Sequence, residues 1–360
     1  MDDPATTDLC VDCRERDASL SIRNRRLCSA CFMRYVTSKV LKRMESFRFK
    51  TLSGDDRRRL LLPVSGGVSS LVLLHVLDAQ LQRQIASRNR TAYDLVVLRV
   101  VLPEDEGSTT LKGDYEELAR KFSAHRILPL LDLQAVFKLD THIERDFEHL
   151  GLRRHGSESD ESFLNRMLSC ATSVTARADL QSILLQRLIV SAARQHGCES
   201  VVWGHSDSRL AALVLADVAK GRGGSVPSTI ADGPSLHGIN SNYPMRDLFK
   251  TELQSYAQLV PDPLLAKVAD SGETTAPPTA MRHTSIDTLL RTYIHSQGEK
   301  YPGIMANVVR TASKLDGRQA STITATCPVC IRLIVRSQGL LNPDGNLCYG
   351  CDRMRNDIKS

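Results

Sequence analysis

The sequence predicts an α/β fold in which a parallel sheet carries helices on both faces, flanked at each end of the chain by a four-cysteine module. Between residues 58 and 260, apolar segments of strand length alternate with segments of helix length. This alternation favours a parallel sheet covered on both faces. Eight of the 10 cysteines form Cys-x-x-Cys pairs, two pairs near each end of the 360-residue chain. Two Cys-x-x-Cys pairs close together in the chain predict a small lobe that is held by a metal ion.

The chain divides by composition into four expected regions. Residues 1–50 form an N-terminal zinc module followed by a basic helix, 51–265 an α/β domain, 266–285 a disordered linker, and 286–360 C-terminal helices with a zinc ribbon. Mobile surface loops are expected at the Gly- and Ser-rich segments 151–162 and 221–238. The expected strands are 60–64, 94–102, 126–131 and 199–203, and the expected helices are 70–88, 112–123, 176–196, 207–220, 286–296 and 303–315, with a further one within 31–49.

The composition is that of a globular protein, with 42% hydrophobic and 24% charged residues. No stretch approaches the ~18 consecutive apolar residues of a membrane span, so no membrane partner is expected. The first residues are acidic and hold no sustained apolar run, which argues against a secretory signal. A cytoplasmic location is expected, and cysteines there are seldom in disulfides.

The paired cysteines predict two structural Zn²⁺ sites. Each Cys-x-x-Cys pair directs two thiolates to one point, and two pairs complete the tetrahedral shell that Zn²⁺ prefers. Thiol redox chemistry and an iron–sulfur cluster remain the alternatives. Cys170 and Cys198 stand alone and are interpreted as thiols without a role. The expected ligands are Cys10, Cys13, Cys28 and Cys31 in the first module, and Cys327, Cys330, Cys348 and Cys351 in the second.

The segment LLLPVSGGVSSLVLLHVL (60–77) reads as a strand, a Ser-Gly-Gly turn and a helix, a layout that holds phosphate groups on a helix N-terminus. Ser65-Gly66-Gly67-Val68-Ser69-Ser70 resembles the SGGxDS loop of the PP-loop ATP pyrophosphatases (adenine nucleotide α-hydrolase-like fold). Ser69 stands at the Asp position of that loop, and Val68 replaces the Lys of the thiolating members. The resemblance implies that a carboxylate for Mg²⁺ and a positive charge near the phosphates are both missing.

A second segment, VVWGHSDSRLAALVLADVAKGRG (201–223), resembles the strand–GHNxDD–helix segment of the same enzymes. Ser208 and Arg209 replace its acidic pair, and Ser206 replaces its Asn. The thiolating members also carry a Cys-x-x-Cys where 169–181 holds only Cys170. These losses predict a degenerate site with no catalytic residue, and they make ATP a doubtful cofactor. The expected nucleotide-binding residues of this degenerate site are Ser65, Gly66, Gly67, Ser69, Ser70, Gly204 and His205.

Positive charge is concentrated near the N-terminus. From Arg14 to Arg59 the chain carries fourteen Arg or Lys and five Asp or Glu. Such an excess favours a polyanionic partner such as RNA, although each single cation, taken alone, is better read as an ordinary solvated side chain. The RNA-binding candidates are Arg34, Lys39, Lys42, Arg43, Arg57, Arg58, Arg59, Lys220 and Arg222.

Taken with the strings at 243–257, 301–315 and 327–330, these motifs resemble the thiouridylase subunit 2 family, the second subunit of the eukaryotic cytosolic tRNA 2-thiolation complex. The resemblance implies a heterodimer with a catalytic PP-loop paralogue that thiolates the wobble uridine of Lys, Glu and Gln tRNAs. It also implies a ubiquitin-like sulfur carrier that reaches the chain through the complex. This chain would then bind tRNA and support the catalytic subunit.

Two other functions stay open. One is an active ATP-dependent sulfurtransferase with an altered pocket, in which Ser69 and Ser70 hold phosphate and Cys170 or Cys198 carries sulfur. The other is a zinc-dependent interaction scaffold unrelated to RNA.

Overall fold

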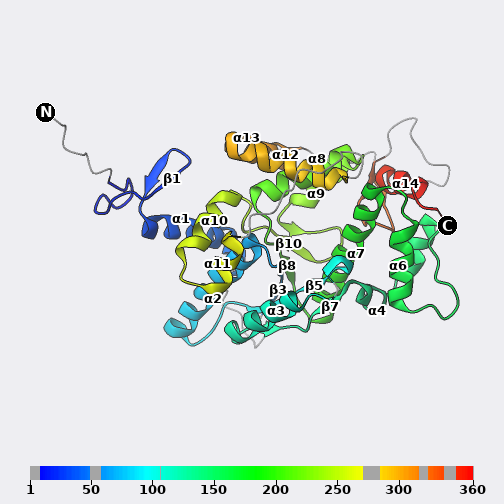
Figure 1. The fold of residues 1–360 in the computed structure, drawn as a ribbon, viewed down its shortest axis with the longest axis horizontal. Helices are drawn as coiled ribbons and strands as arrows, with labels where there is room; N and C mark the ends of the chain where they lie inside the picture. Colours follow the sequence, from blue (N-terminus) through cyan, green and yellow to red (C-terminus); the bar gives the residue numbers. More distant parts are fainter. Residues whose placement is uncertain are drawn as a thin grey trace.

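A six-stranded sheet forms the centre of the molecule (Figure 1). The computed structural model describes residues 9–48, 58–105, 107–270, 284–315, 323–335 and 346–359. The strand order is β6-β4-β3-β8-β10-β9, and all neighbouring pairs are parallel except β10 with β9. The strands are β3 Arg59–Pro63, β4 Asp94–Leu98, β6 Arg126–Ile127, β8 Ser200–Val202, β9 Gly233–Pro234 and β10 Asn240–Asn242. The predicted parallel sheet is confirmed.

Helices cover both faces of this sheet because its central strands are apolar on both sides. In β3, Leu60 and Leu62 join the hydrophobic cluster that contains α2 (Val68–Arg88) and α3 (Thr109–Lys121). Leu61 joins the opposite cluster with Ile189 and Val190 of α7 (Val174–Gln195). Successive residues of a strand point to opposite faces, so one apolar run serves two cores.

Two of the expected strands are each split in two. Residues 94–102 form β4 and then β5 (Val100–Val101), and 126–131 contains β6 and the start of β7 (Leu131–Asp132). β5 pairs with β7 in a separate small sheet. The break between β4 and β5 falls at Arg99, directly beyond the carboxyl end of a central strand.

A helical layer lies along the upper edge of the molecule in Figure 1. Leu210, Ile294 and Met305 share one hydrophobic cluster in which α8 (Asp207–Ala219) packs against two later helices. On the other side of the sheet, two helices near the end of the α/β region pack against α2. The helices are α9 Val226–Ile230, α12 Ile286–Lys300 and α13 Pro302–Lys314 in the first layer, and α10 Lys250–Leu259 and α11 Pro263–Asp270 beside α2.

The two cysteine modules lie at opposite ends of the molecule (Figure 1). The N-terminal module comprises β1 (Leu20–Ile22), β2 (Arg25–Leu27) and α1 (Ser29–Arg43), and α1 buries one apolar side against the core. The C-terminal module comprises β11 Ile323–Thr326, β12 Leu333–Val335 and α14 Tyr349–Asn356, and it packs beside α4 Val136–Leu139, α5 Ile143–Phe147 and α6 Asp160–Cys170.

The expectation of a mobile loop at 221–238 is wrong. This segment contains α9 and β9, and Val226 and Ile230 are fully buried. Elements of two to five residues carry too few side chains to show a period, so their Gly and Ser content dominates the sequence signal. The expected linker at 266–285 also needs correction, because α11 continues to Asp270; residues 271–283 lie outside the described part of the chain.

Candidate functional site

The two glycine motifs meet at the carboxyl edge of the sheet. Strands β3 and β8 are parallel neighbours, so the loops that follow them emerge side by side. A Cβ placed on Gly204 would lie 2.8 Å from the Ser70 Cα, a distance that no real side chain tolerates. Glycine is therefore required for the loop after β8 to approach the first turn of α2. The structure thus brings the two motifs together.

The loop after β3 keeps the backbone form of a phosphate loop. Gly66 has a φ of +82°, which favours glycine, and Gly67 is the N-cap of α2 without a side-chain cap. The Ser70 hydroxyl donates to the Gly67 carbonyl at 2.9 Å, while Ser65 Oγ accepts from the Gly67 N–H at 3.4 Å. Ser69 lies half-buried on the same turn. The helix N-terminus, with its partial positive charge, faces the loop.

Arg99 places a positive charge beside this loop. A Cβ on Gly66 would lie 2.9 Å from Arg99 Nη2, so the guanidinium lies directly against the turn. Burial lowers the pKa of Arg99 from its usual value, and Asp105 and Asp114 partly oppose that shift. The expectation that the loop lacks a nearby cation is therefore wrong. Arg99 belongs to the end of a neighbouring strand, and the sequence gives no signal that links it to Gly66.

His205 is held as a neutral ring in an aromatic stack. Its ring lies 5.5 Å from that of Trp203 and 5.8 Å from that of Tyr243, centroid to centroid. Burial, reinforced by the charge of Arg209, lowers the pKa of His205 to about 3. Its Nδ1 has no hydrogen-bond partner among the described residues. A neutral imidazole offers a phosphate no ionic partner.

Asp207 is an acid that the motif comparison overlooked, since it occupies the variable position between the replaced residues. Only 1% of Asp207 is exposed, and one carboxylate oxygen accepts from the Ser208 N–H at 2.5 Å and hydroxyl at 2.9 Å. The other oxygen has no partner among the described residues. Burial raises the pKa of Asp207 to about 7. This carboxyl is protonated about half the time at neutral pH, so it is a poor Mg²⁺ ligand.

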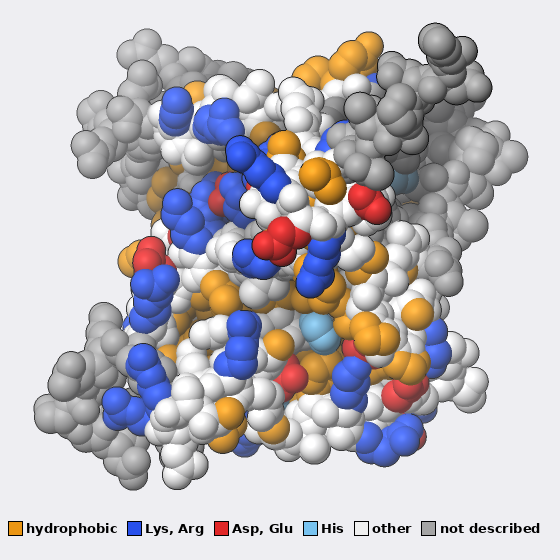
Figure 2. Space-filling view, turned by 90° about the vertical axis from the view of Figure 1, so that its left-hand side faces the viewer, with side chains coloured by type: hydrophobic (Ala, Val, Ile, Leu, Met, Phe, Trp, Pro, Cys, Tyr) orange, Lys and Arg blue, Asp and Glu red, His pale blue; other side chains and the backbone are white. Residues whose placement is uncertain are grey.

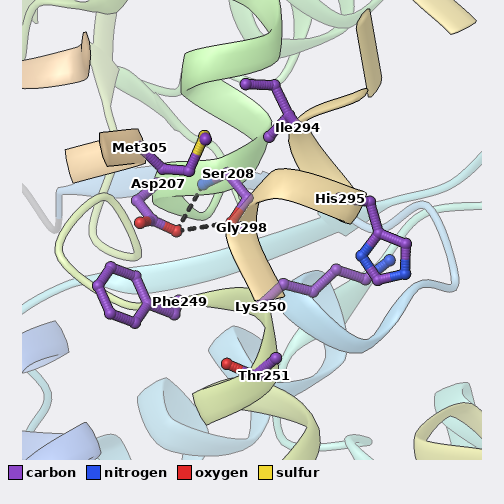
Figure 3. Close-up of a pocket in the computed structure, with 9 residues that line it drawn as sticks. All are labelled: Asp207, Ser208, Phe249, Lys250, Thr251, Ile294, His295, Gly298 and Met305. Atoms are coloured by element: carbon purple, nitrogen blue, oxygen red, sulfur yellow. Dashed lines mark hydrogen bonds between the residues drawn. The ribbon is translucent and has the colours of Figure 1, made fainter. Parts of the chain in front are cut away.

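Asp207 lines a small pocket where the first turns of α8 and α10 meet α12 (Figure 3). The Lys250 side chain extends toward the ring of His295, and Asp207 lies on the other side of the pocket (Figure 3). The volume of about 20 Å³ suffices for roughly one water molecule, not for a nucleotide. The remaining lining residues are Ser208, Phe249, Thr251, Ile294, Gly298 and Met305.

Neither single cysteine lies at the carboxyl edge of the sheet. Cys198 precedes β8 at the opposite edge, where burial raises its pKa to about 11. Cys170 ends α6 and packs with the C-terminal module. A thiolate that attacks an activated carbon must stand next to it, so neither residue fits the sulfur carrier of the alternative active enzyme.

Each cysteine module gathers four sulfurs into one metal-sized group. The four sulfur atoms of either set lie within 4.8 Å of one another. In both modules the first pair ends in a turn whose next residue, Arg14 or Ile331, has a left-handed φ of 57°. The second pair occupies the N-cap and first turn of a helix, α1 or α14. This arrangement fits a tetrahedral four-sulfur metal site.

Comparison with known proteins places the chain in a family. A family model described as "Cytoplasmic tRNA 2-thiolation protein 2" matches residues 285–339. Proteins of that name from Aspergillus clavatus and Aspergillus oryzae are both 39% identical to this chain, and each alignment covers 98% of both sequences. The corresponding protein of Ajellomyces capsulatus is 40% identical, over 90% of this chain and 95% of its own length. The chain belongs to this family.

The fold agrees with that assignment. A U34-tRNA thiolase, NcsA from Methanococcus maripaludis, solved with its [4Fe-4S] cluster, superposes with a TM-score of 0.57. The superposition covers 90% of this chain and 92% of the thiolase at 12% sequence identity, a level that speaks for the fold alone. The predicted resemblance to the subunit 2 family and its PP-loop fold is confirmed.

Two of the basic candidates of this family member are buried. Lys220 donates to Asp179 at 2.8 Å and pairs with Asp287, and Arg222 donates to Asp179 at 3.0 Å. The acids come from α7 and α12; Asp179, Lys220 and Arg222 are buried, and Asp287 is partly exposed. Lys220 and Arg222 are therefore structural cations, and their assignment as RNA contacts was wrong.

The remaining basic candidates differ in how free they are. Arg43 is paired with Asp247, and Arg58 with Glu199, although both are partly exposed. Four candidates are exposed or half-buried on α1 and β3, namely Arg34, Lys39, Lys42 and Arg59. Arg57 lies outside the described part of the chain. Arg58 and Arg59 lie at the amino end of β3, the sheet edge opposite the phosphate loop. No described helix is both long and apolar enough to cross a membrane.

Proposed function

We propose that this chain is the non-catalytic partner subunit of a cytoplasmic tRNA 2-thiolation enzyme. The observation that carries the proposal is the contact between Gly204 and the first turn of α2, which keeps the backbone of a nucleotide site. The same site has Ser69, Ser208 and Arg209 where the related enzymes place acids. A preserved backbone without its acids and without an adjacent thiol is suited to support, not to adenylation or sulfur transfer.

Catalysis then belongs to a PP-loop paralogue that forms a heterodimer with this chain. The paralogue adenylates the wobble uridine of Lys, Glu and Gln tRNAs and places sulfur on its C2. A ubiquitin-like carrier delivers the sulfur through the complex. This chain contributes tRNA-binding surface and keeps the catalytic subunit in its active arrangement.

The proposed tRNA contacts on the N-terminal side are the cations that have no carboxylate partner among the described residues. Arg34 and Lys42 are exposed on α1, and Arg59 is exposed at the start of β3. Figure 2 shows the side of the molecule that carries α1, where blue Lys and Arg side chains are spread over the described surface and red acidic ones are fewer. Each phosphate that a cation neutralises steepens the slope of log K for tRNA binding against log salt concentration by about 0.7 to 0.9.

Zn²⁺ is the proposed metal of both modules. Four thiolates within 4.8 Å match its preference for sulfur and its tetrahedral geometry. Bound Zn²⁺ would hold the turn of the first pair against the helix of the second. Metal analysis of the purified chain should give two zinc ions per chain and no iron; an iron–sulfur absorption spectrum would overturn this assignment.

The deciding experiment compares the purified chain alone, the paralogue alone and the co-purified pair in thiolation of tRNA. We expect thiolated product from the pair only. Efficient thiolation by this chain alone would establish the active-enzyme alternative. A pair that thiolates normally while this chain adds nothing to tRNA affinity would favour the interaction scaffold.

A further inference from the structure

The outer sides of α12 and α13 are unusual for a surface that faces only water. Both helices pack on α8 through buried side chains, among them Ile294 and Met305. Their opposite sides are turned to solvent, along the upper edge of the molecule in Figure 1. Two large aromatic side chains are exposed there: 52% of Tyr293 and 56% of Tyr301. Exposed apolar side chains that gather on one surface mark binding sites.

Helical spacing places the exposed residues on common stripes. On α12, Leu289, Tyr293 and Lys300 recur at i, i+4 and i+11, positions that share one side of a helix. On α13, Arg310 and Lys314 recur at i and i+4. Tyr301 lies at the junction between the two helices. We call the set Leu289, Tyr293, Lys300, Tyr301, Ile304, Arg310 and Lys314 the α12–α13 surface; all seven are exposed.

The charge of this surface has one sign. Within the described ranges, Lys300, Arg310 and Lys314 have no acidic partner. The nearby Asp287 lies at the start of α12 and is paired with buried Lys220. Three exposed cations on two neighbouring helices create a positive potential that attracts a polyanion.

We propose that the α12–α13 surface is a second tRNA-docking surface, separate from the cations of α1. The inference rests on the proposed function. Its cations contact phosphates, and Tyr293 and Tyr301 stack on unpaired bases, for which aromatic rings between basic side chains are suited. A protein partner is disfavoured because the cores of protein interfaces are depleted in Lys and other charged residues.

The test uses the complex of this chain with its paralogue and measures tRNA affinity across a series of salt concentrations. The charge variant is Lys300→Glu with Arg310→Glu and Lys314→Glu. It should bind tRNA at least about tenfold more weakly, with a salt slope smaller by about 2 to 3. The matched control is Lys112→Glu, an exposed cation on α3 at the other edge of the fold, which should leave affinity within about twofold.

The stacking variants separate aromatic contact from charge. Tyr293→Ala with Tyr301→Ala should weaken binding at least about fivefold with an unchanged salt slope, while Tyr293→Phe with Tyr301→Phe should retain binding. Thermal unfolding of each variant checks the fold, which surface substitutions leave intact.

Three results overturn the inference in distinguishable ways. Folded variants with normal affinity and slope would exclude this surface and leave the proposed function standing. Loss of the paralogue from the purified complex, with tRNA affinity unchanged, would show that the surface is a protein interface. A wild-type complex that does not bind tRNA would overturn the proposed function together with the inference.

Discussion

The two four-cysteine modules share a plan and differ in their surroundings. In each, a turn with a left-handed residue presents one cysteine pair, and the start of a helix presents the other. The C-terminal set is buried at all four cysteines, whereas Cys13 of the N-terminal set is half-buried. The turn and the helix start of each module determine the geometry of its cysteine ligands. The elements packed around a module determine how much of the fold depends on its metal site.

Side chains from the α/β core reach into the C-terminal module. Arg187 of α7 donates to the carbonyl of Pro328 at 3.0 Å and pairs with Asp140 and Asp146. Arg222 donates to Cys351 Sγ at 3.8 Å. Burial alone would lower the pKa of Arg222, but Asp179 and the cysteine sulfurs raise it well above its usual value. These contacts, and the buried cluster that the module shares with α4 to α7, fix it to the rest of the fold.

The N-terminal module contacts the core through α1 and through the turn between β1 and β2. Arg23, in the turn between β1 and β2, donates to both carboxylate oxygens of Glu252 at 2.9 and 3.1 Å and stacks on Phe249. Tyr35 donates to the same carboxylate at 3.2 Å. Arg43 at the end of α1 also pairs with Asp247, and the apolar side of α1 packs on the core. We expect this module to behave as a lobe attached to the core, although Cys10, Cys28 and Cys31 join the hydrophobic cluster that also contains Leu60 and Leu62 of β3.

The largest expected effect is on loss of a metal ligand. Cys351→Ser should prevent folding of the whole chain, because the proposed Zn²⁺ would contribute about 10 to 16 kcal/mol, as much as the entire stability of a domain. Cys13→Ser should remove about one zinc and leave a cooperative unfolding transition of the core. Metal content and thermal unfolding measure both. Equal damage from the two substitutions would abolish the distinction between core module and attached lobe.

The next effect tests how the core holds the C-terminal module. Arg187→Met should lower the free energy of unfolding by about 3 to 5 kcal/mol, because it leaves the buried Asp146 and the half-buried Asp140 without Arg187. Chemical denaturation measures this loss. The control is Arg83→Met, an exposed cation on α2 that should change stability by less than about 0.5 kcal/mol. A similar small change at Arg187 would contradict the integration of this module.

A pH experiment probes Asp207, the first residue of α8, which lies beside the first turn of α10. Its folded pKa of about 7 lies above the unfolded value, so folding favours the protonated form. Its contribution to stability is complete below about pH 4, is lost as pH rises to about 7, and is constant above that. Asp207→Asn should remove about 2 kcal/mol of destabilisation that develops between pH 5 and 7. Parallel pH–stability profiles of variant and wild type would rule this out.

The smallest effect concerns the fastening of the N-terminal lobe. A double-mutant cycle with Arg23→Ala and Glu252→Gln should give a coupling energy of about 1 kcal/mol, because solvent reaches the partly exposed Arg23. Arg25→Ala, which breaks the pair with Asp12 inside the same module, is the control and should cost less. Limited proteolysis should release the lobe faster in the first variants only. Zero coupling would leave the apolar side of α1 and the Arg43–Asp247 pair as the attachment of the lobe.

The core strands and long helices were predictable because their signal is local. The apolar run around Leu61 and the helical period after Gly67 lie within a few residues of one another, and the structure places β3 and α2 there. The strand β10, Asn240–Asn242, has no apolar signal and was missed, since it is held by pairing with β8 and not by its own side chains. Short elements of this kind depend on neighbours that are distant in sequence.

The candidate site was predictable in part for the same reason. The cysteine ligand sets, the glycines of both loops and the replacement of acids by Ser69 and Arg209 depend on spacing along the chain, so the amino-acid sequence alone determined them. Only the tertiary structure decided that Arg99 lies against Gly66 and that the buried Lys220 is paired with Asp179. Whether a charged side chain is free or paired depends on groups brought together by folding, and the Coulomb energy between them depends on that distance and on burial.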